Sequence, residues 1–187
     1  MNRIPCIRRG VSMRSLKRFA VFAAAVPIVV LGASAAGAAG PNTSFAFNAR
    51  DITGTSGAVT LTGGGAFSSS AHPAHSGGGF SCTSAVMGSG PLAGCQTGEG
   101  VRWDSDTLVT SPTTFKCLAN EAPKTVTTGD DTVVLHADFY RAGDGIDESF
   151  NANMFVSTHD IDNGVPGVQN VWVQGVGCAT AAVHFSP

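Results

Sequence analysis

The feature of this 187-residue chain that most limits its fold is a series of short segments in which apolar and polar residues alternate. Gly, Pro, Asn and Asp separate these segments, and no stretch repeats its apolar residues with the helical period of about 3.6 residues. The pattern is typical of antiparallel strands, so the sequence predicts an all-β fold, either an antiparallel β-sandwich or a small β-barrel of roughly 8–10 short strands. The expected strands are Ser44–Arg50, Gly57–Thr62, Gly65–Ser68, Gly78–Cys82, Gly100–Asp104, Thr113–Leu118, Lys124–Thr128, Asp131–Tyr140, Glu148–Ser157, Gln169–Val176 and Thr180–Ser186. Ser68–Gly79 and Ser84–Gly98 are expected to be exposed loops.

One expected hairpin, Asp131–Tyr140 with Glu148–Ser157, can be assigned residue by residue. Pairing Tyr140 with Asp147 makes the apolar faces of the two strands coincide, whereas a shift by one residue would bury polar groups. The opposite face then carries His136, Asp138, Tyr140, Ser149, Asn151 and Asn153. In a sandwich this face is the solvated outside, and in a small barrel it could line a polar cavity.

An imidazole and a carboxylate come two residues apart on that polar face, at His136 and Asp138. The two groups could orient one another for general acid–base chemistry or bind a metal ion together. Tyr140, Arg141 and Glu148 are the further catalytic candidates. The chain contains no G-x-S-x-G, H-E-x-x-H or phosphate-loop motif, so no reaction follows from these residues alone.

Two tryptophans stand among polar residues. Trp103 has four charged neighbours in the sequence, Glu99, Arg102, Asp104 and Asp106. Trp172 shares an expected strand face with Asn170 and Gln174, and Asn151 lies on the polar face of the hairpin. Carboxylates beside an aromatic ring suit a carbohydrate site. The same pattern equally suits a tryptophan buried under a loop.

Two turn sequences concentrate acidic residues beside glycine. The first holds Asp144, Asp147 and Glu148, and the second holds Asp160 and Asp162. Carboxylate oxygens are the ligands that Ca²⁺ prefers, so a structural calcium ion is one interpretation, and no other cofactor is predicted. Neither segment completes an EF-hand loop, and the alternative is that Asp, Asn and Gly simply form turns here.

Four cysteines follow the N-terminal region: Cys82, Cys95, Cys117 and Cys178. An even number of cysteines in an exported domain predicts disulfide bonds, and three pairings are open. We favour Cys82–Cys95, which closes a loop rich in Gly and Pro, together with Cys117–Cys178, which ties the last strands to the middle of the sheet. The absence of any Cys-x-x-Cys pair argues against a zinc site.

Residues 1–39 have the pattern of a secretory signal peptide. Six basic residues and no acid precede Phe19, an apolar run follows, and small residues with two A-x-A patterns end the segment. Met13 could be the true start, and the Ala- and Gly-rich signal is typical of bacteria. We therefore expect one secreted domain over residues 40–187, located outside the cell or at the cell envelope, with no membrane span after cleavage.

The remaining domain carries five basic and thirteen acidic residues, a formal charge of −8. Such a charge disfavours nucleic acid as a partner and leaves a glycan or a protein open. The leading hypothesis is a non-catalytic binding or structural domain. One alternative is a small hydrolase or isomerase that uses His136 and Asp138. Another is an inhibitor or effector that presents the loop Ala85–Gly94.

Overall fold

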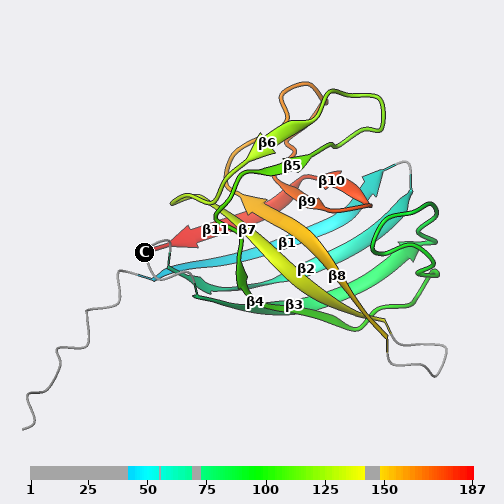
Figure 1. Ribbon diagram of the computed structural model, residues 1–187, viewed down its shortest axis with the longest axis horizontal. Helices are drawn as coiled ribbons and strands as arrows, with labels where there is room; N and C mark the ends of the chain where they lie inside the picture. Colours follow the sequence, from blue (N-terminus) through cyan, green and yellow to red (C-terminus); the bar gives the residue numbers. More distant parts are fainter. Residues whose placement is uncertain (1–41, 55, 69–72, 142–147) are drawn as a thin grey trace, which may run out of the picture. The chain divides into compact units, whose positions relative to one another are not determined.

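The computed structural model describes residues 42–54, 56–68, 73–141 and 148–187, and these residues form eleven β-strands and no helix (Figure 1). The all-β prediction is therefore confirmed. No helix in the described part of the chain could cross a membrane. In chain order the strands are β1 (Thr43–Gly54), β2 (Gly57–Phe67), β3 (Pro73–Ser84), β4 (Arg102–Leu108), β5 (Thr113–Phe115), β6 (Lys124–Val126), β7 (Thr132–Arg141), β8 (Glu148–Ser157), β9 (Val171–Val173), β10 (Gly177–Ala179) and β11 (Ala181–Ser186).

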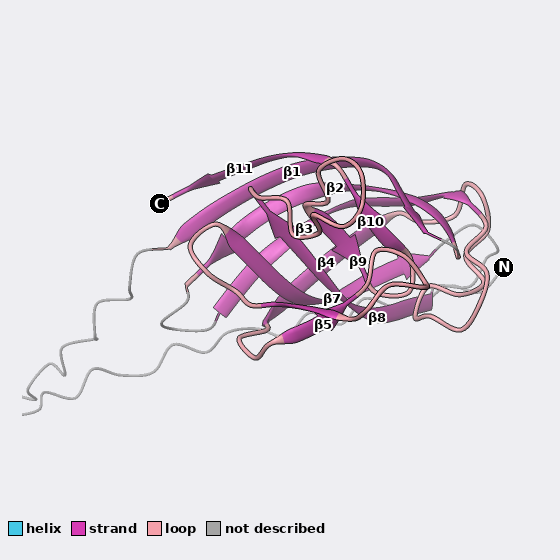
Figure 2. Cartoon of the chain, turned by 90° about the horizontal axis from the view of Figure 1, so that it is seen from above, coloured by secondary structure: helices cyan, strands magenta, loops and turns pink. Residues whose placement is uncertain are grey.

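Nine of these strands form one antiparallel sheet, in the order β10-β9-β8-β7-β4-β3-β2-β1-β11. β1 pairs with β11, and Thr53 near the end of β1 also pairs with Cys178 of β10. This second pairing joins β10, at one end of the sheet, to β1, which is next to the other end, so the strands from β10 to β1 close into a small barrel (Figure 2). The remaining strands, β5 and β6, pair only with each other and lie in the connection between β4 and β7.

Glycine-rich strands surround a central tryptophan. The expected loop Ser68–Gly79 is wrong in its second half, because β3 begins at Pro73 and its glycines pair with those of β2. A Cβ on Gly63 would lie 2.7 Å from Cζ2 of Trp103, so this position has room only for glycine. The Trp103 indole Nε1 donates a hydrogen bond of 2.9 Å to the carbonyl of Thr62. Gly63 of β2 therefore makes space for this core ring.

The β7–β8 hairpin has the predicted faces but a different register. Tyr140 pairs with Ser149 instead of Asp147, and the ladder extends to the pair Arg141 and Glu148. A shift of two residues keeps every side chain on its face, because side chains alternate with a period of two. The apolar pattern therefore determines the faces, but it cannot choose between these two registers.

The barrel interior is filled with apolar side chains from all its strands. Phe80 and Phe139 meet edge to face with ring centroids 5.2 Å apart, and Phe47 lies 5.9 Å from the ring of Trp103. The side chains of Leu135 and Met154 on the β7–β8 hairpin are completely buried in this core. The interpretation of the barrel interior as a polar ligand cavity is therefore wrong.

A second hydrophobic core lies outside the barrel. It is enclosed between strands β7–β9 and the segment that contains β5 and β6 (residues 113–126), which is called the β5–β6 segment below. Phe115 packs edge to face on Phe155, with centroids 4.9 Å apart, and Phe155 stacks on Trp172 at 5.8 Å. Val134 joins this core, whereas its neighbour Leu135 faces the barrel interior. β7 and β9 are therefore buried on both faces where the segment covers them, as their runs of consecutive apolar residues require.

Both expected disulfides are present. Cys82–Cys95 closes the loop after β3, in which Val86 and Leu92 are buried and Met87 is 67% exposed. Cys117–Cys178 joins the β5–β6 segment to β10. The β5–β6 segment covers the second core, and the second disulfide therefore attaches this cover to the barrel.

Candidate functional site

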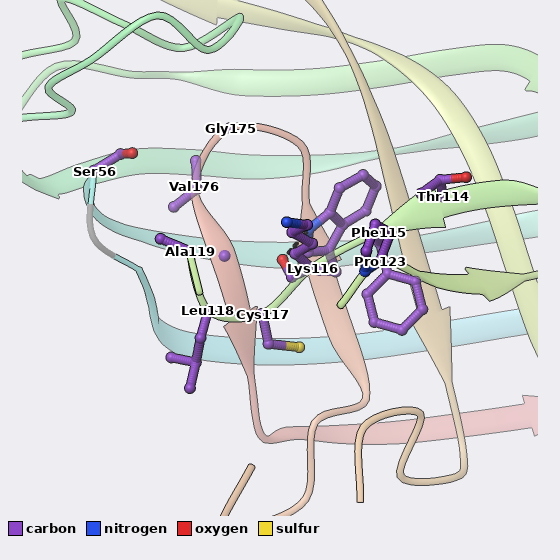
Figure 3. A pocket seen from close by; sticks show the side chains of 12 residues that line it. Ser56, Thr114, Phe115, Lys116, Cys117, Leu118, Ala119, Pro123, Gly175 and Val176 are labelled. Carbon is purple, nitrogen blue, oxygen red and sulfur yellow. Dashed lines mark hydrogen bonds between the residues drawn. The ribbon is translucent and has the colours of Figure 1, made fainter. Parts of the chain in front are cut away.

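A cleft of about 290 Å³ lies at the edge of the second core (Figure 3). One wall is the segment Thr114–Ala119 together with Pro123, and the other is Ser56 with the turn Gly175–Gly177. Phe115 and Trp172 also line this space, although they are only 2% and 5% exposed. The two aromatic residues therefore contribute a small area to the cleft.

The Trp172 ring is held firmly in this position. Its Nε1 donates a hydrogen bond of 3.1 Å to the carbonyl of Lys116, and the rings of Phe115 and Phe155 pack against it. Only 5% of the residue is exposed. The expectation of an open platform for a sugar is therefore wrong for Trp172. The alternative, a tryptophan buried under a loop, is correct, and only part of the residue reaches the cleft.

The far wall of the cleft is built by close backbone packing. Gly175 adopts a positive φ of 81°, and a Cβ there would lie 2.8 Å from both Gly90 Cα and Pro91 Cδ. The turn after β9 is thus pressed against the loop closed by Cys82–Cys95. Because the Cys82–Cys95 disulfide holds the loop against which this turn packs, we expect the wall to move little when a ligand enters.

The charge of the cleft comes from one side chain. Among the described residues that line it, only Lys116 carries a charge, and this lysine is exposed. The cleft is therefore a local site where an anionic group would be favoured.

A second cavity of about 410 Å³ lies on the other side of Cys117 and Leu118. Its described lining includes Arg50, Asp51 and Thr180 but no aromatic ring. Asp51 has a left-handed φ of 56° at the bulge in β1. Since its charges are of both signs and no aromatic residue lines it, this cavity is less suited to a flat ligand than the cleft beside Trp172.

The polar face of the β7–β8 hairpin lies on the outside of the barrel. His136 is exposed, and its Nδ1 forms a hydrogen bond of 2.8 Å with Oδ1 of Asn153. Asp138 pairs across the ladder with Asn151 and is partly exposed. The enzyme hypothesis required these groups to line an enclosed pocket, and their position on the solvated face of the sheet removes its basis.

The charged neighbours of Trp103 do not form a sugar site with it. Trp103 is 1% exposed and points into the barrel, so it presents no ring face to a ligand. Asp104 faces the opposite way and accepts a hydrogen bond of 3.3 Å from the Tyr140 hydroxyl, while the Arg102 guanidinium lies 4.2 Å from the Tyr140 ring centre. Asp106 pairs with His75. Alternation along β4 thus separates the acids from the ring.

Three further candidates have structural roles. Arg141 forms an ion pair with Glu99 at 3.5 Å and lies over the ring of Phe150. These contacts do not involve His136. Asn170 is buried and bonds both the N–H and the carbonyl of Ala181. Gln174 accepts a hydrogen bond of 3.0 Å from the Asn153 N–H. The Glu148 side chain lies outside the described part of the structure.

The predicted calcium residues are divided. Asp144 and Asp147 lie outside the described residues. Asp160 Oδ1 accepts hydrogen bonds of 3.0 Å from the N–H groups of Asp162 and Gln169, so it organises the turn, as the alternative interpretation held. Asp162 forms an ion pair with the ammonium group of Lys124.

Lys124 also contacts Glu121, at 3.1 Å. The Cys117 sulfur lies near these carboxylates but is part of a disulfide and is not available as a metal ligand. Burial acts to raise the pKa of Glu121, but hydrogen bonds from the Leu118 N–H, the Lys124 ammonium and the Cys117 N–H together lower that pKa below its ordinary value.

Neither a protein-family model, nor a curated protein, nor a solved structure matches the chain. Function is therefore argued from the site itself. Sequence reasoning missed Lys116 and the rest of the Thr114–Ala119 wall. The available signal was Phe115 alternating with Cys117 in an otherwise polar connection, a pattern that predicts a segment packed against the barrel.

Proposed function

We propose that this protein is a secreted, non-catalytic domain that binds a small, flat, apolar molecule with an anionic group in the cleft beside Trp172. The observation that carries the proposal is the combination of Phe115 and Trp172 with Lys116 as the only charged group among the described lining residues.

The size and chemistry of the cleft support a small ligand. About 290 Å³ lies at the lower end of the volumes that small-molecule sites have, so one or two fused rings would fit. A flat molecule would contact the small exposed parts of Phe115 and Trp172, and a carboxylate would interact with Lys116 at the exposed rim. Since the lysine is exposed, this electrostatic contribution is expected to weaken with added salt.

Two features of the chain support export. Residues 1–39 have the basic, apolar and small-residue pattern of a signal peptide, with the Ala- and Gly-rich composition that bacterial signals have. The two disulfides are compatible with an oxidising compartment outside the cell.

The test uses tryptophan fluorescence with 2-naphthoate and its neutral amide as probes. We expect 2-naphthoate to change the emission of Trp172 and to bind more tightly than the amide. Lys116→Gln should remove the difference between the two probes, and Ala119→Leu, which narrows the cleft, should weaken both.

Val101→Asp is the matched control, because Val101 is also exposed and apolar but does not line the cleft. Trp172→Phe should abolish the signal, which assigns it to this ring instead of Trp103. The proposal is refuted if neither probe binds, or if Ala119→Leu and Val101→Asp bind both probes as the unchanged protein does.

A further inference from the structure

Three ionisable side chains meet where the β5–β6 segment touches the connection between β8 and β9. Lys124 at the start of β6 contacts Asp162, which lies 38 positions later in the chain. Its Nζ also donates a hydrogen bond of 3.1 Å to Glu121 Oε2. Oxygens of the two carboxylates lie within 4.8 Å of each other. One amine thus contacts two carboxylates, and none of the three side chains lines the cleft proposed to bind a ligand.

Asp162 is in an unusual environment for a carboxylate. Its side chain is 0% exposed, and its Oδ1 accepts hydrogen bonds from Lys124 Nζ and from the Gly164 N–H at 3.0 Å. Its Oδ2 is buried without a hydrogen-bond partner among the described residues. A buried, charged oxygen without a donor is unfavourable. An uncharged amide at the same place would have one oxygen fewer and no charge.

Glu121 is placed to move protons between the other two groups. The N–H groups of Cys117 and Leu118 both donate to its Oε1, which leaves Oε2 directed at Lys124. Glu121 Oε2 is thus within hydrogen-bond distance of the amine and can exchange a proton with it.

From this geometry we propose that Lys124 and Asp162 react with each other to form an intramolecular amide bond. A proton first passes from the Lys124 ammonium to the Asp162 carboxylate, which leaves an amine and a carboxylic acid. The Nζ lone pair then attacks Cγ of Asp162. Glu121 takes a proton from Nζ and delivers it to the departing hydroxyl. The Nζ–Cγ bond forms, one Cγ–O bond breaks, and one water molecule leaves.

The fold supplies what favours this reaction. The reacting groups are held in contact, which replaces an encounter in solution and raises their effective concentration greatly. Burial of Asp162 limits the access of water, and conversion of the ion pair into a neutral amide removes the charge of this buried carboxylate. The hydrogen bond with Asp162 raises the pKa of Lys124, so the neutral amine is scarce and the reaction is slow.

The bond would give the cover of the second core a second covalent attachment. Cys117–Cys178 already joins the β5–β6 segment to the barrel, but a reductant can open it. An amide between Lys124 and Asp162 would join the same segment to the β8–β9 connection and would survive reduction. The cleft wall Thr114–Ala119 would then stay in place in either redox condition.

The exported protein, reduced and alkylated, is tested by intact-mass measurement and peptide mapping. We expect a mass lower than that of the sequence by one water molecule, and a branched peptide that contains both Lys124 and Asp162. Lys124→Arg, which keeps the positive charge, should restore the full mass, whereas the matched control Lys116→Arg should not. Glu121→Gln should slow the water loss at least tenfold.

A full mass for the unchanged protein after prolonged incubation overturns the proposal, whatever the variants show. A water loss that persists in Lys124→Arg also overturns it, because a cyclised Asp-Gly sequence would then be the source. These measurements do not involve the cleft, so their outcome is independent of the ligand proposal.

Discussion

Removal of Cys117–Cys178 should cost more stability than removal of Cys82–Cys95. The first bond spans 61 positions of the chain and the second spans 13. In the chain-entropy model, closed loops of these lengths stabilise a protein by about 4 and about 3 kcal/mol, respectively. Replacing both cysteines of a pair by alanine should therefore lower the free energy of unfolding by these amounts.

The two losses should also differ in kind. β5 and β6 have three residues each, and so short a hairpin is not stable without support. Without Cys117–Cys178, the segment that covers Trp172 should loosen and admit water to the ring. Loss of Cys82–Cys95 leaves that cover attached. We therefore expect a red shift of the folded-state emission only when the first pair is removed.

The assay is urea unfolding followed by circular dichroism, with fluorescence emission recorded before the transition. Both double variants are made in the Lys124→Arg background, so that the disulfide is the only covalent attachment of the β5–β6 segment. An equal or larger loss for the Cys82–Cys95 pair, or an unshifted emission without Cys117–Cys178, would refute the reasoning about what this bond holds.

Three further outcomes are expected. Because its folded-state pKa is lowered, Glu121 contributes stability that is fully present above its ordinary pKa of 4.5 and is lost as the pH falls through the lowered value. In urea titrations at several pH values, Glu121→Gln should therefore reduce the loss of stability on the acid side. Trp103→Phe should cost about 1–3 kcal/mol in the same titrations, because the bond to the Thr62 carbonyl is lost and a space opens in the barrel core, and a loss within experimental error would contradict this role. His136→Ala should change the unfolding free energy by less than about 0.5 kcal/mol and leave 2-naphthoate binding unchanged, since the ring lies on the solvated face; a large loss in either measurement would show that this face does more than shield the sheet.

The alternation of side chains was sufficient to predict several features of this protein. It identified most of the strands, although β2 unites two of the predicted ones and β3 begins inside a predicted loop. It also placed His136 and Asp138 on the face opposite Leu135, because side chains on a strand alternate whatever the tertiary structure. The number and spacing of the cysteines favoured the two disulfides that are present. The strand and face predictions depend only on local geometry, whereas Cys117–Cys178 spans 61 positions of the chain.

Only the tertiary structure decided what each face meets. Whether the outer face of β9 is open or covered depends on the β5–β6 segment, which lies more than 40 positions earlier in the chain. Contact with this segment buries Trp172, which the sequence alone had suggested as an open platform. The Trp103 ring lies where Gly63 of β2 leaves space for it. The meeting of Lys124 with Asp162 likewise joins distant segments. A period of two specifies which side chains share a face, but it contains no information about which distant segment will cover that face.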